Sequence, residues 1–328
     1  MTIHRRLFMI GALGAGLAVS GCASRLPDIT LPRGTQLQFG PDNRFEAMLR
    51  QIEGEADGTL GVELFDVSTG HSVGINRDRK FGHCSSFKLS LAAMVLASDS
   101  LGIVDAARRV MWSEDDLMFV SPFTTQRLTQ GATLHELAEA TQKYSDNTAA
   151  NILLREYGGP QALTAFWSGI GDNVSRLDRY EPRVNYVPVT EYRDTTTPAA
   201  MARTVAALAF GGVLPDAERA LLRQWMIDTE TGARRVRAGL HEELVGGDKT
   251  GTSIWPGMGS LYVDIGFVQP PADKSGEDEK WKSGPFTFAT YFRTRTATDG
   301  IDPSAEAALA RVGEVLSAFA ERPDFWPF

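Results

Sequence analysis

The stretch SSFKLSLAAMVLA, residues 85–97, decides how the rest of the chain is organised. After Lys88 nearly every residue in it is apolar, which is typical of a helix buried on all sides. Ser85 and Lys88 are three positions apart, so a helix presents both on one face. Outward from this run the pattern stays mainly helical to about residue 210, with an irregular stretch from about 178 to 198. The middle of the chain is therefore predicted to be a helical block.

Strand patterns lie on both sides of this helical block. Before it, residues 60–67 alternate between apolar and polar, and a turn at 68–70 leads into a second strand. The expected strands on the two sides cover residues 60–67, 71–76, 261–268 and 286–293, with a long polar loop at 270–285. Apolar residues at helical spacing predict one helix near each end, at 42–55 and 303–320. The helical block is thus predicted to be an insertion into a sheet built from both ends of the chain.

The first 22 residues have the composition of an export signal. Arg5 and Arg6 precede an apolar run, residues 7–19, that is too short and too rich in glycine to span a bilayer. The arginine pair resembles a twin-arginine signal, and residues 19–22 resemble a bacterial lipobox. We expect an export signal at 1–22, a lipid on Cys22 and a tether at 23–40, which predicts a periplasmic or membrane-anchored lipoprotein. The alternative is cleavage by ordinary signal peptidase nearby, with Cys22 either lost or left without a role.

Composition limits the partners and cofactors of the chain. Its net charge is −8 over 328 residues and it has no long basic cluster, which argues against a nucleic-acid surface. Its only cysteines, Cys22 and Cys84, are too few and too far apart for a cysteine-based zinc site, and a lipidated Cys22 leaves no internal disulfide. No metal or cofactor is expected, membrane contact is expected only through the lipid, and the chain is expected to be a monomer. The histidines of the mature chain follow no Ser-His-Asp pattern or metal-ligand spacing, at positions 71, 83, 135 and 241.

Three short motifs carry possible chemistry, and each has an ordinary explanation when it is taken alone. Ser85 with Lys88 fits a serine nucleophile beside an amine base, because burial and the helix dipole lower the pKa of a lysine. The same pair also fits an N-capping serine and a solvated lysine. Ser145-Asp146-Asn147 fits a helix N-cap, and Lys249-Thr250-Gly251 fits a polar turn. Together and in this order they form the signature of class A β-lactamases and penicillin-binding proteins.

From about residue 44 to residue 320 the chain resembles a class A serine β-lactamase. The resemblance implies an α/β (α+β) fold, with a five-stranded antiparallel sheet flanked by the terminal helices and an inserted all-helical lobe. It implies a β-lactamase domain over 41–328, with the sheet lobe at about 41–83 and 235–328 and the helical lobe at about 84–234. The active site is expected between the two lobes, and the substrate is expected to be a small β-lactam.

A fourth motif separates a β-lactamase from its relatives. Residues 179–185, RYEPRVN, resemble the loop in which class A enzymes hold the hydrolytic water, with Glu181 and Asn185 spaced to grip it. Arg179 and Asp194 are expected to close this loop with an ion pair. On composition alone, Glu181 fits a surface carboxylate. A D,D-peptidase or a β-lactam sensor gains nothing from fast deacylation, so Glu181 and Asn185 argue against both.

The resemblance implies hydrolysis of the β-lactam amide through an acyl-enzyme on Ser85. Lys88, or Glu181 acting through a water molecule, takes the proton of Ser85. The backbone N–H groups of Ser85 and Thr252 form the oxyanion hole, and Glu181 activates the water that releases the acyl group. The expected catalytic residues are Ser85, Lys88, Ser145, Glu181, Asn185 and Lys249.

The resemblance also implies how the substrate is bound. Its carboxylate needs an arginine, and the strand expected after Lys249, residues 252–261, offers none. Arg235 resembles an alternative placement, with Arg234 and Arg237 as competitors. Cys84 precedes the nucleophile as in some carbapenem-hydrolysing relatives, whose partner cysteine is absent here. Where many relatives have an aromatic residue at the pocket rim, this chain has a valine. The expected substrate-binding residues are Asn147, Thr250, Gly251, Thr252, Arg235 and Val120.

Overall fold

The computed structural model describes residues 42–271, 280–282 and 284–321. The expected export signal, the tether and Cys22 lie outside these residues, as does most of the polar loop after residue 271. Among the described helices, none is long and apolar enough to cross a membrane.

The fold is built on one five-stranded sheet in which all neighbouring strands are antiparallel. In sheet order the strands are β2 (Ser72–Ile75), β1 (Gly58–Asp66), β9 (Phe286–Thr294), β8 (Leu261–Gln269) and β7 (Val245–Ser253). The two N-terminal strands thus lie at one side of the sheet and the three C-terminal strands complete it. This arrangement confirms the predicted five-stranded antiparallel sheet.

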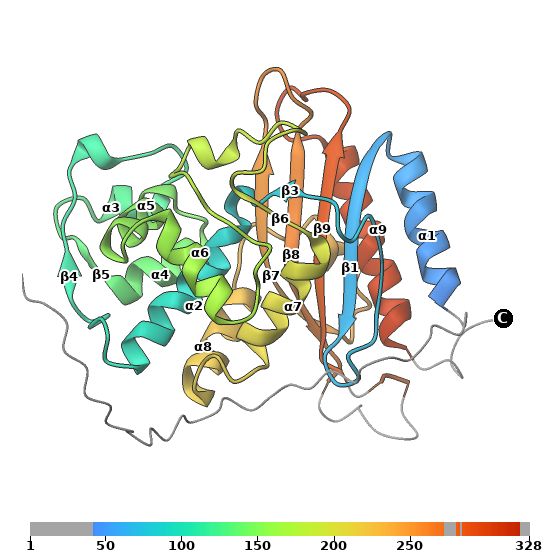
Figure 1. Cartoon of the computed structure of the whole chain (residues 1–328), viewed down its shortest axis with the longest axis horizontal. Coiled ribbons are helices and arrows are strands. Elements are labelled where there is room, and N and C mark those ends of the chain that lie inside the picture. The colour runs from blue at the N-terminus through green and yellow to red at the C-terminus, as the bar shows by residue number, and fades with distance from the viewer. Residues whose placement is uncertain (1–41, 272–279, 283, 322–328) are drawn as a thin grey trace, which may run out of the picture. The chain divides into compact units, whose positions relative to one another are not determined.

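Helices from the two ends of the chain cover one face of the sheet (Figure 1). These are α1 (Asp42–Glu55) and α9 (Pro303–Ala320), which also contact each other. Their apolar sides, with Phe45, Leu49 and Phe319, form one hydrophobic core against the sheet. On the other face, α7 (Pro198–Ala209) and α8 (Asp216–Ile227) pack against the strands.

The remaining helices surround α2 (Phe87–Ser100), whose residues Phe87–Ala97 are all buried. This burial is what the apolar run at 89–97 predicts. The surrounding elements are α3 (Pro122–Gln126), α4 (Leu134–Lys143), α5 (Asn147–Glu156) and α6 (Pro160–Gly169). Two short pairs of antiparallel strands lie outside the main sheet. They are β3 (Phe81–Gly82) with β6 (Thr195–Thr196), and β4 (Arg109–Val110) with β5 (Ala132–Thr133). The predicted boundaries between the two lobes stay a prediction.

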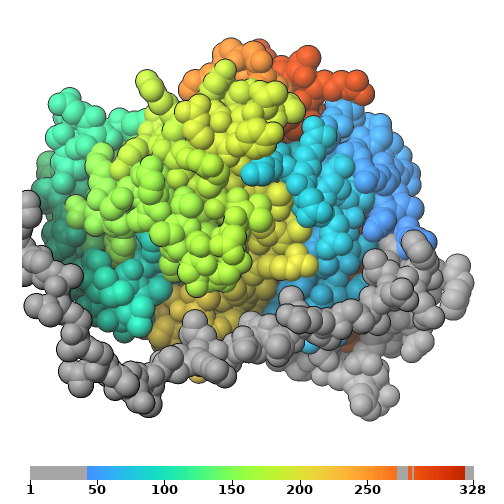
Figure 2. Space-filling view, viewed as in Figure 1, coloured from blue at the N-terminus to red at the C-terminus, as the bar shows by residue number. Residues whose placement is uncertain are grey.

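The described residues also form four 3₁₀ turns: η1 (Cys84–Ser86), η2 (Glu114–Asp116), η3 (Arg183–Asn185) and η4 (Val236–Gly239). Between α6 and α7 the chain follows an irregular course through η3, as predicted for about 178–198. In Figure 2 the yellow-green atoms of this part cover the middle of the visible face. We call residues 178–194 the active-site loop.

One expected strand was placed wrongly. Residues 254–260 form a turn, and the strand that carries Lys249 is β7, Val245–Ser253. Its sequence, VGGDKTGTS, is poor in the β-branched and aromatic residues that favour strands. It is a strand because it pairs with β8 along its whole length. Its glycines allow close packing, since a Cβ on Gly247 would lie 2.7 Å from the Phe267 ring.

Candidate active site

Ser85 lies in the 3₁₀ turn η1, directly before α2, and Lys88 lies in the first turn of α2. The Lys88 ammonium nitrogen is 3.0 Å from Ser85 Oγ. Cys84 turns the chain with a φ of 47°, a left-handed conformation that side chains other than glycine rarely adopt. Ser85 is half-buried and lines the pocket, whereas Lys88 is fully buried. The serine and lysine are therefore arranged on one face, as predicted.

The Lys88 side chain is the centre of the site. Its Nζ donates to the backbone carbonyl of Ser145 over 2.8 Å and to Asn147 Oδ1 over 2.5 Å. It is also 3.3 Å from Glu181 Oε1, and both side chains are inaccessible to solvent. Burial lowers the pKa of Lys88, while the Glu181 carboxylate acts in the opposite direction.

Ser145 is presented by the start of α5. Asp146 is the N-cap of this helix and accepts a hydrogen bond from Ala149 N over 2.8 Å. Ser145 itself has a φ of 58°, which turns the chain sharply before the helix. Its hydroxyl oxygen lies 3.0 Å from Lys249 Nζ and 3.4 Å from Lys88 Nζ. One serine hydroxyl thus contacts both buried lysines.

Lys249 reaches Ser145 from the edge strand β7. Burial lowers its pKa well below the usual range, and the nearby charge of Lys88 acts in the same direction. Gly251, two residues further on, faces the nucleophile turn. A Cβ there would lie 2.8 Å from Cys84 Cβ and 2.9 Å from Ser85 N, so only glycine lets β7 come this close.

The active-site loop brings Glu181 and Asn185 to the same place. Asn185 Nδ2 donates to Glu181 Oε2 over 2.5 Å. Asn151, on α5, holds the backbone of Glu181 from both sides, because its amide accepts from Glu181 N and donates to Glu181 O, each over 3.0 Å. The Glu181–Pro182 peptide bond is cis. Asn151 was not predicted from the sequence, although its spacing of four from Asn147 places both residues on one helix face.

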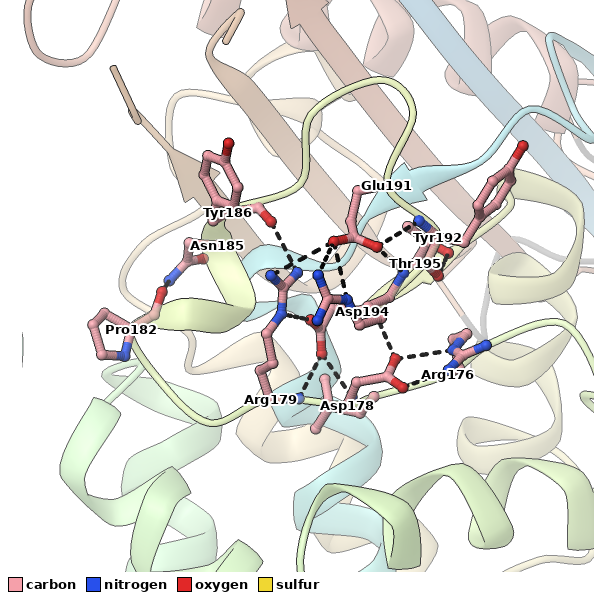
Figure 3. Close-up of polar contacts among 12 residues, drawn as sticks. Arg176, Asp178, Arg179, Pro182, Asn185, Tyr186, Glu191, Tyr192, Asp194 and Thr195 are labelled. Carbon is pink, nitrogen blue, oxygen red and sulfur yellow. Dashed lines mark hydrogen bonds and ion pairs between the residues drawn. The ribbon is translucent and has the colours of Figure 1, made fainter. Parts of the chain in front are cut away.

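An ion network closes the two ends of this loop (Figure 3). Arg179 pairs with Asp194, as predicted, and donates to the backbone carbonyl of Tyr186 over 2.8 Å. Asp194 also accepts from the backbone N–H of Asp178 over 2.7 Å. Burial raises the pKa of Asp194. At the exposed side, Glu191 accepts from Arg193, which lowers the pKa of Glu191 to about 2.

A pocket of about 460 Å³ opens in front of Ser85. Lys88, Glu181 and Lys249 lie buried behind its wall. Asn147 lines the pocket, but its side chain bridges Lys88 and the backbone carbonyl of Phe119, over 2.7 Å to the latter. Phe119, next to Val120, is an aromatic lining residue that the sequence analysis did not name. The predicted residues on the lining are Ser85, Val120, Ser145, Asn147, Asn185, Arg235, Thr250, Gly251 and Thr252.

Of the three candidate arginines, Arg235 lines the pocket and lies against β7. Its guanidinium donates to the carbonyls of Gly251 and Val263, each over 2.8 Å, and to Thr252 Oγ1 over 2.6 Å. Arg237 pairs with the buried Asp248 instead, over 2.6 Å. Arg234 is 77% exposed and shares the carboxylate of Glu306 with Arg235. Glu306 also lines the pocket and was not found from the sequence.

The histidines do not gather at the pocket. Each packs against an aromatic ring, with His83 stacked on Trp167 at 4.8 Å between ring centroids. The other three pairs are His71 with Phe319, His135 with Trp225 and His241 with Trp281. Within the part of the chain that the structure describes, no group of three or more His, Cys, Asp or Glu side chains is placed to hold a metal ion.

Comparisons with known proteins agree with this geometry. The sequence model of the β-lactamase enzyme family matches residues 44–317. A β-lactamase of Mycobacterium tuberculosis is 36% identical over 287 residues, which cover 82% of this chain and 89% of that one. A β-lactamase structure from Desulfarculus baarsii has 35% identity and a TM-score of 0.77, covering 86% of this chain and 98% of that one. The class A β-lactamase of the last common ancestor of Gram-negative bacteria has 41% identity and a TM-score of 0.76, covering 84% and 98%. The chain therefore belongs to the β-lactamase enzyme family and, within it, to the class A serine β-lactamases.

Proposed function

We propose that the enzyme hydrolyses the lactam amide of penicillin- and cephalosporin-type antibiotics through an acyl-enzyme on Ser85, and that Glu181 activates the water that releases the acyl group. The buried Glu181 and the half-buried Asn185 beside it carry this proposal. Among the described residues, Asn185 Oδ1 is a buried atom that accepts no hydrogen bond, and Lys88 is the one partner of the buried Glu181 Oε1. Two such acceptors suit a water molecule, which has two protons to donate. Glu181 Oε1 also lies 3.3 Å from Lys88, which contacts Ser85.

Two bases are within reach of the Ser85 hydroxyl. A neutral Lys88 can donate its two N–H groups to the Ser145 carbonyl and to Asn147 Oδ1, and keep its lone pair for Ser85. Its burial favours that neutral form. Glu181 reaches Ser85 through the water molecule that it later activates. Either base leaves Ser85 as the nucleophile that attacks the lactam carbonyl.

The oxygen of the attacked carbonyl becomes negative and needs donors. We assign this role to the backbone N–H groups of Ser85 and Thr252, each of which contributes about 3 kcal/mol in such sites. The close approach of Gly251 to Ser85 N supports this assignment, because it brings the two donors together. Ser145 passes a proton to the departing lactam nitrogen, and Lys249 orients its hydroxyl by donating to Ser145 Oγ over 3.0 Å.

We assign the substrate carboxylate to the hydroxyls of Thr250 and Thr252 and to the charges of Lys249 and Arg235. Arg235 donates to Thr252 Oγ1, so that this hydroxyl is free to donate its own proton to an anion. Thr250 Oγ1 lies 2.6 Å from Thr231 Oγ1, and either hydroxyl can be the donor of this hydrogen bond. Asn147, together with the backbone at Thr252, is assigned to the amide of the substrate side chain, and Val120 to the pocket rim.

The test is Glu181→Ala in the full chain. Its Ser85 and Lys88 remain, so we expect acylation by a chromogenic cephalosporin to proceed, while deacylation stalls for lack of the base. Intact mass at successive times should then find a lasting adduct on Ser85, which Ser85→Ala should abolish. Turnover by Glu181→Ala at the rate of the parent enzyme contradicts the role assigned to Glu181.

We also propose that the enzyme is exported and anchored to a membrane by a lipid on Cys22. The support is the sequence of residues 5–22, since this part lies outside the described residues. Cys22→Ser should move the activity from the membrane fraction to the soluble fraction of a producing cell. Activity that stays in the soluble fraction for both proteins contradicts the lipid anchor. The monomeric state remains a prediction, for which sedimentation equilibrium is the measurement.

A further inference from the structure

Three residues form a row across the sheet, at the end nearest the active-site loop. Ser253 on β7 pairs with Leu261 on β8, and Leu261 pairs with Arg293 on β9. Residues directly opposite in neighbouring antiparallel strands point to the same face, so all three side chains lie on one side of the sheet. This is also the face of Lys249 and Gly251, which precede Ser253 at steps of two along β7.

Two residues of this row donate hydrogen bonds to backbone carbonyls of the active-site loop that are two positions apart. Ser253 Oγ donates to the backbone carbonyl of Asn185 over 2.7 Å. Arg293 Nη2 donates to the backbone carbonyl of Val187 over 2.9 Å. The Val187 side chain is 2% exposed and leaves no room for a Cβ on Gly82, which would lie 2.9 Å from Val187 Cγ2. We call Ser253, Arg293 and the two carbonyls that they hold the loop clasp.

Arg293 is an unusual residue for a purely structural contact. It is 7% exposed, and among the described residues it has no carboxylate partner. Its guanidinium donates to two backbone carbonyls, that of Val187 and, over 3.4 Å, that of Gly259. A buried cation without a counter-ion is stable only where such dipoles replace its water. The guanidinium and the loop carbonyls therefore hold each other in place.

Asn185 connects the clasp to the reacting groups. Its backbone carbonyl is bound by Ser253, while its side chain donates to Glu181 Oε2 over 2.5 Å. A shift of Asn185 moves its side-chain amide, which donates to Glu181 and is proposed to bind the hydrolytic water. The acylation groups are held differently, because Ser85, Lys88 and Ser145 have no hydrogen bond with Ser253 or Arg293 among the described residues.

We propose that Ser253 and Arg293 are positioning residues for deacylation: they fix Asn185, and through it Glu181, against the sheet while the acyl-enzyme is hydrolysed. The inference rests on the proposed role of Glu181 and Asn185. With Lys88 as the base for acylation, loss of the clasp should slow deacylation and leave acylation nearly unchanged. A contact that only stabilised the fold would change neither rate, or both together.

The experiment compares Ser253→Ala and Arg293→Met with the parent enzyme in the full chain. Stopped-flow measurements with a chromogenic cephalosporin give the acylation and deacylation rate constants, and quenched intact mass gives the fraction of enzyme acylated on Ser85. We expect deacylation to fall about tenfold or more, because small misplacements cost up to about 100-fold in rate. Acylation should stay within about twofold. Ser253→Thr keeps the hydroxyl and should restore much of the deacylation rate.

Arg295→Met is the matched control, two residues along the chain, with an exposed side chain paired to Asp57. It should leave both rates unchanged. Equal loss of both rates, or unchanged deacylation in Ser253→Ala, overturns the inference. Glu181→Ala distinguishes failure of the clasp from failure of the proposed function. If Glu181→Ala accumulates the adduct and the clasp variants do not, only the clasp is refuted; if Glu181→Ala also turns over freely, the proposed function falls as well.

Discussion

At Gly251 the strand that carries Lys249 comes closest to the turn that carries Ser85. A Cβ at this position would lie within 3.0 Å of Cys84 Cβ, His83 O and Ser85 N. Two of these three are backbone atoms, which cannot move aside as the end of a flexible side chain can. Gly251→Ala should therefore push β7 away from the nucleophile and separate the two N–H groups of the proposed oxyanion hole.

For Gly251→Ala we expect kcat/KM to fall about 100-fold, the loss typical when one oxyanion donor is displaced. The free energy of unfolding should fall by about 1–3 kcal/mol, as for other overpacked sites. Steady-state kinetics and urea unfolding measure the two effects. Gly54→Ala is the control, since a Cβ there meets nothing within 4 Å. Full activity in Gly251→Ala would show that the close approach of β7 is not needed for acylation.

At the scale of helices and strands, the sequence predicted those elements whose apolar residues recur at a regular spacing. The helix predicted at 42–55 is α1, Asp42–Glu55, and the one predicted at 303–320 is α9, Pro303–Ala320, because each has one apolar face against the sheet. The strand β7 was misplaced because it lacks such a pattern and is a strand only through its partner β8. Periodicity reports local burial, whereas pairing depends on residues far away in the chain.

The site residues divide in the same way, into those that local sequence predicts and those that only distant contacts reveal. Motifs of three or four neighbouring residues, such as Ser85 with Lys88, are visible in the sequence, and the structure brings them together. Asn151 and Glu306 were missed because a single polar residue in a helix resembles any solvated residue. The clasp residue Arg293 was missed for a similar reason, as it lies on a strand more than 100 residues from the loop that it holds. Such contacts are set by the register of the sheet.

For the whole molecule, the two faces of the sheet have different roles. One face packs against α1 and α9 in a hydrophobic core, and the other packs against the helical block, with the active site at the β7 edge. Exposed edges invite pairing with other chains. The β2 edge is only four residues long, and the β7 edge is packed against η1 near Gly251. The reacting groups are thus placed where the fold would otherwise leave an open edge.

Stability in acid should depend on His83, which is buried between this sheet edge and α6. Burial lowers the pKa of His83 from 6.5 to about 4, although the Asp172 carboxylate acts in the opposite direction. Backbone hydrogen bonds with Thr195 and Arg176 also act in that opposite direction, but burial has the larger effect. Between pH 6.5 and about 4 the unfolded chain therefore binds a proton at this residue that the folded chain does not. The free energy of unfolding should fall by up to about 3 kcal/mol as the pH decreases through this range.

The buried Asp248 has the opposite effect, because burial raises its pKa to about 6 and the folded chain then binds the extra proton. The pH dependence of the parent protein is a sum of such contributions, so the difference between two proteins isolates His83. In His83→Phe, which keeps a ring against Trp167, the decrease in stability from pH 7 to pH 4.5 should be smaller by about 2–3 kcal/mol. Urea unfolding at both pH values measures it, with His71→Phe at an exposed position as the control. Equal decreases in His83→Phe and the parent would mean that His83 takes up its proton in the folded protein, and that its pKa is close to the ordinary value.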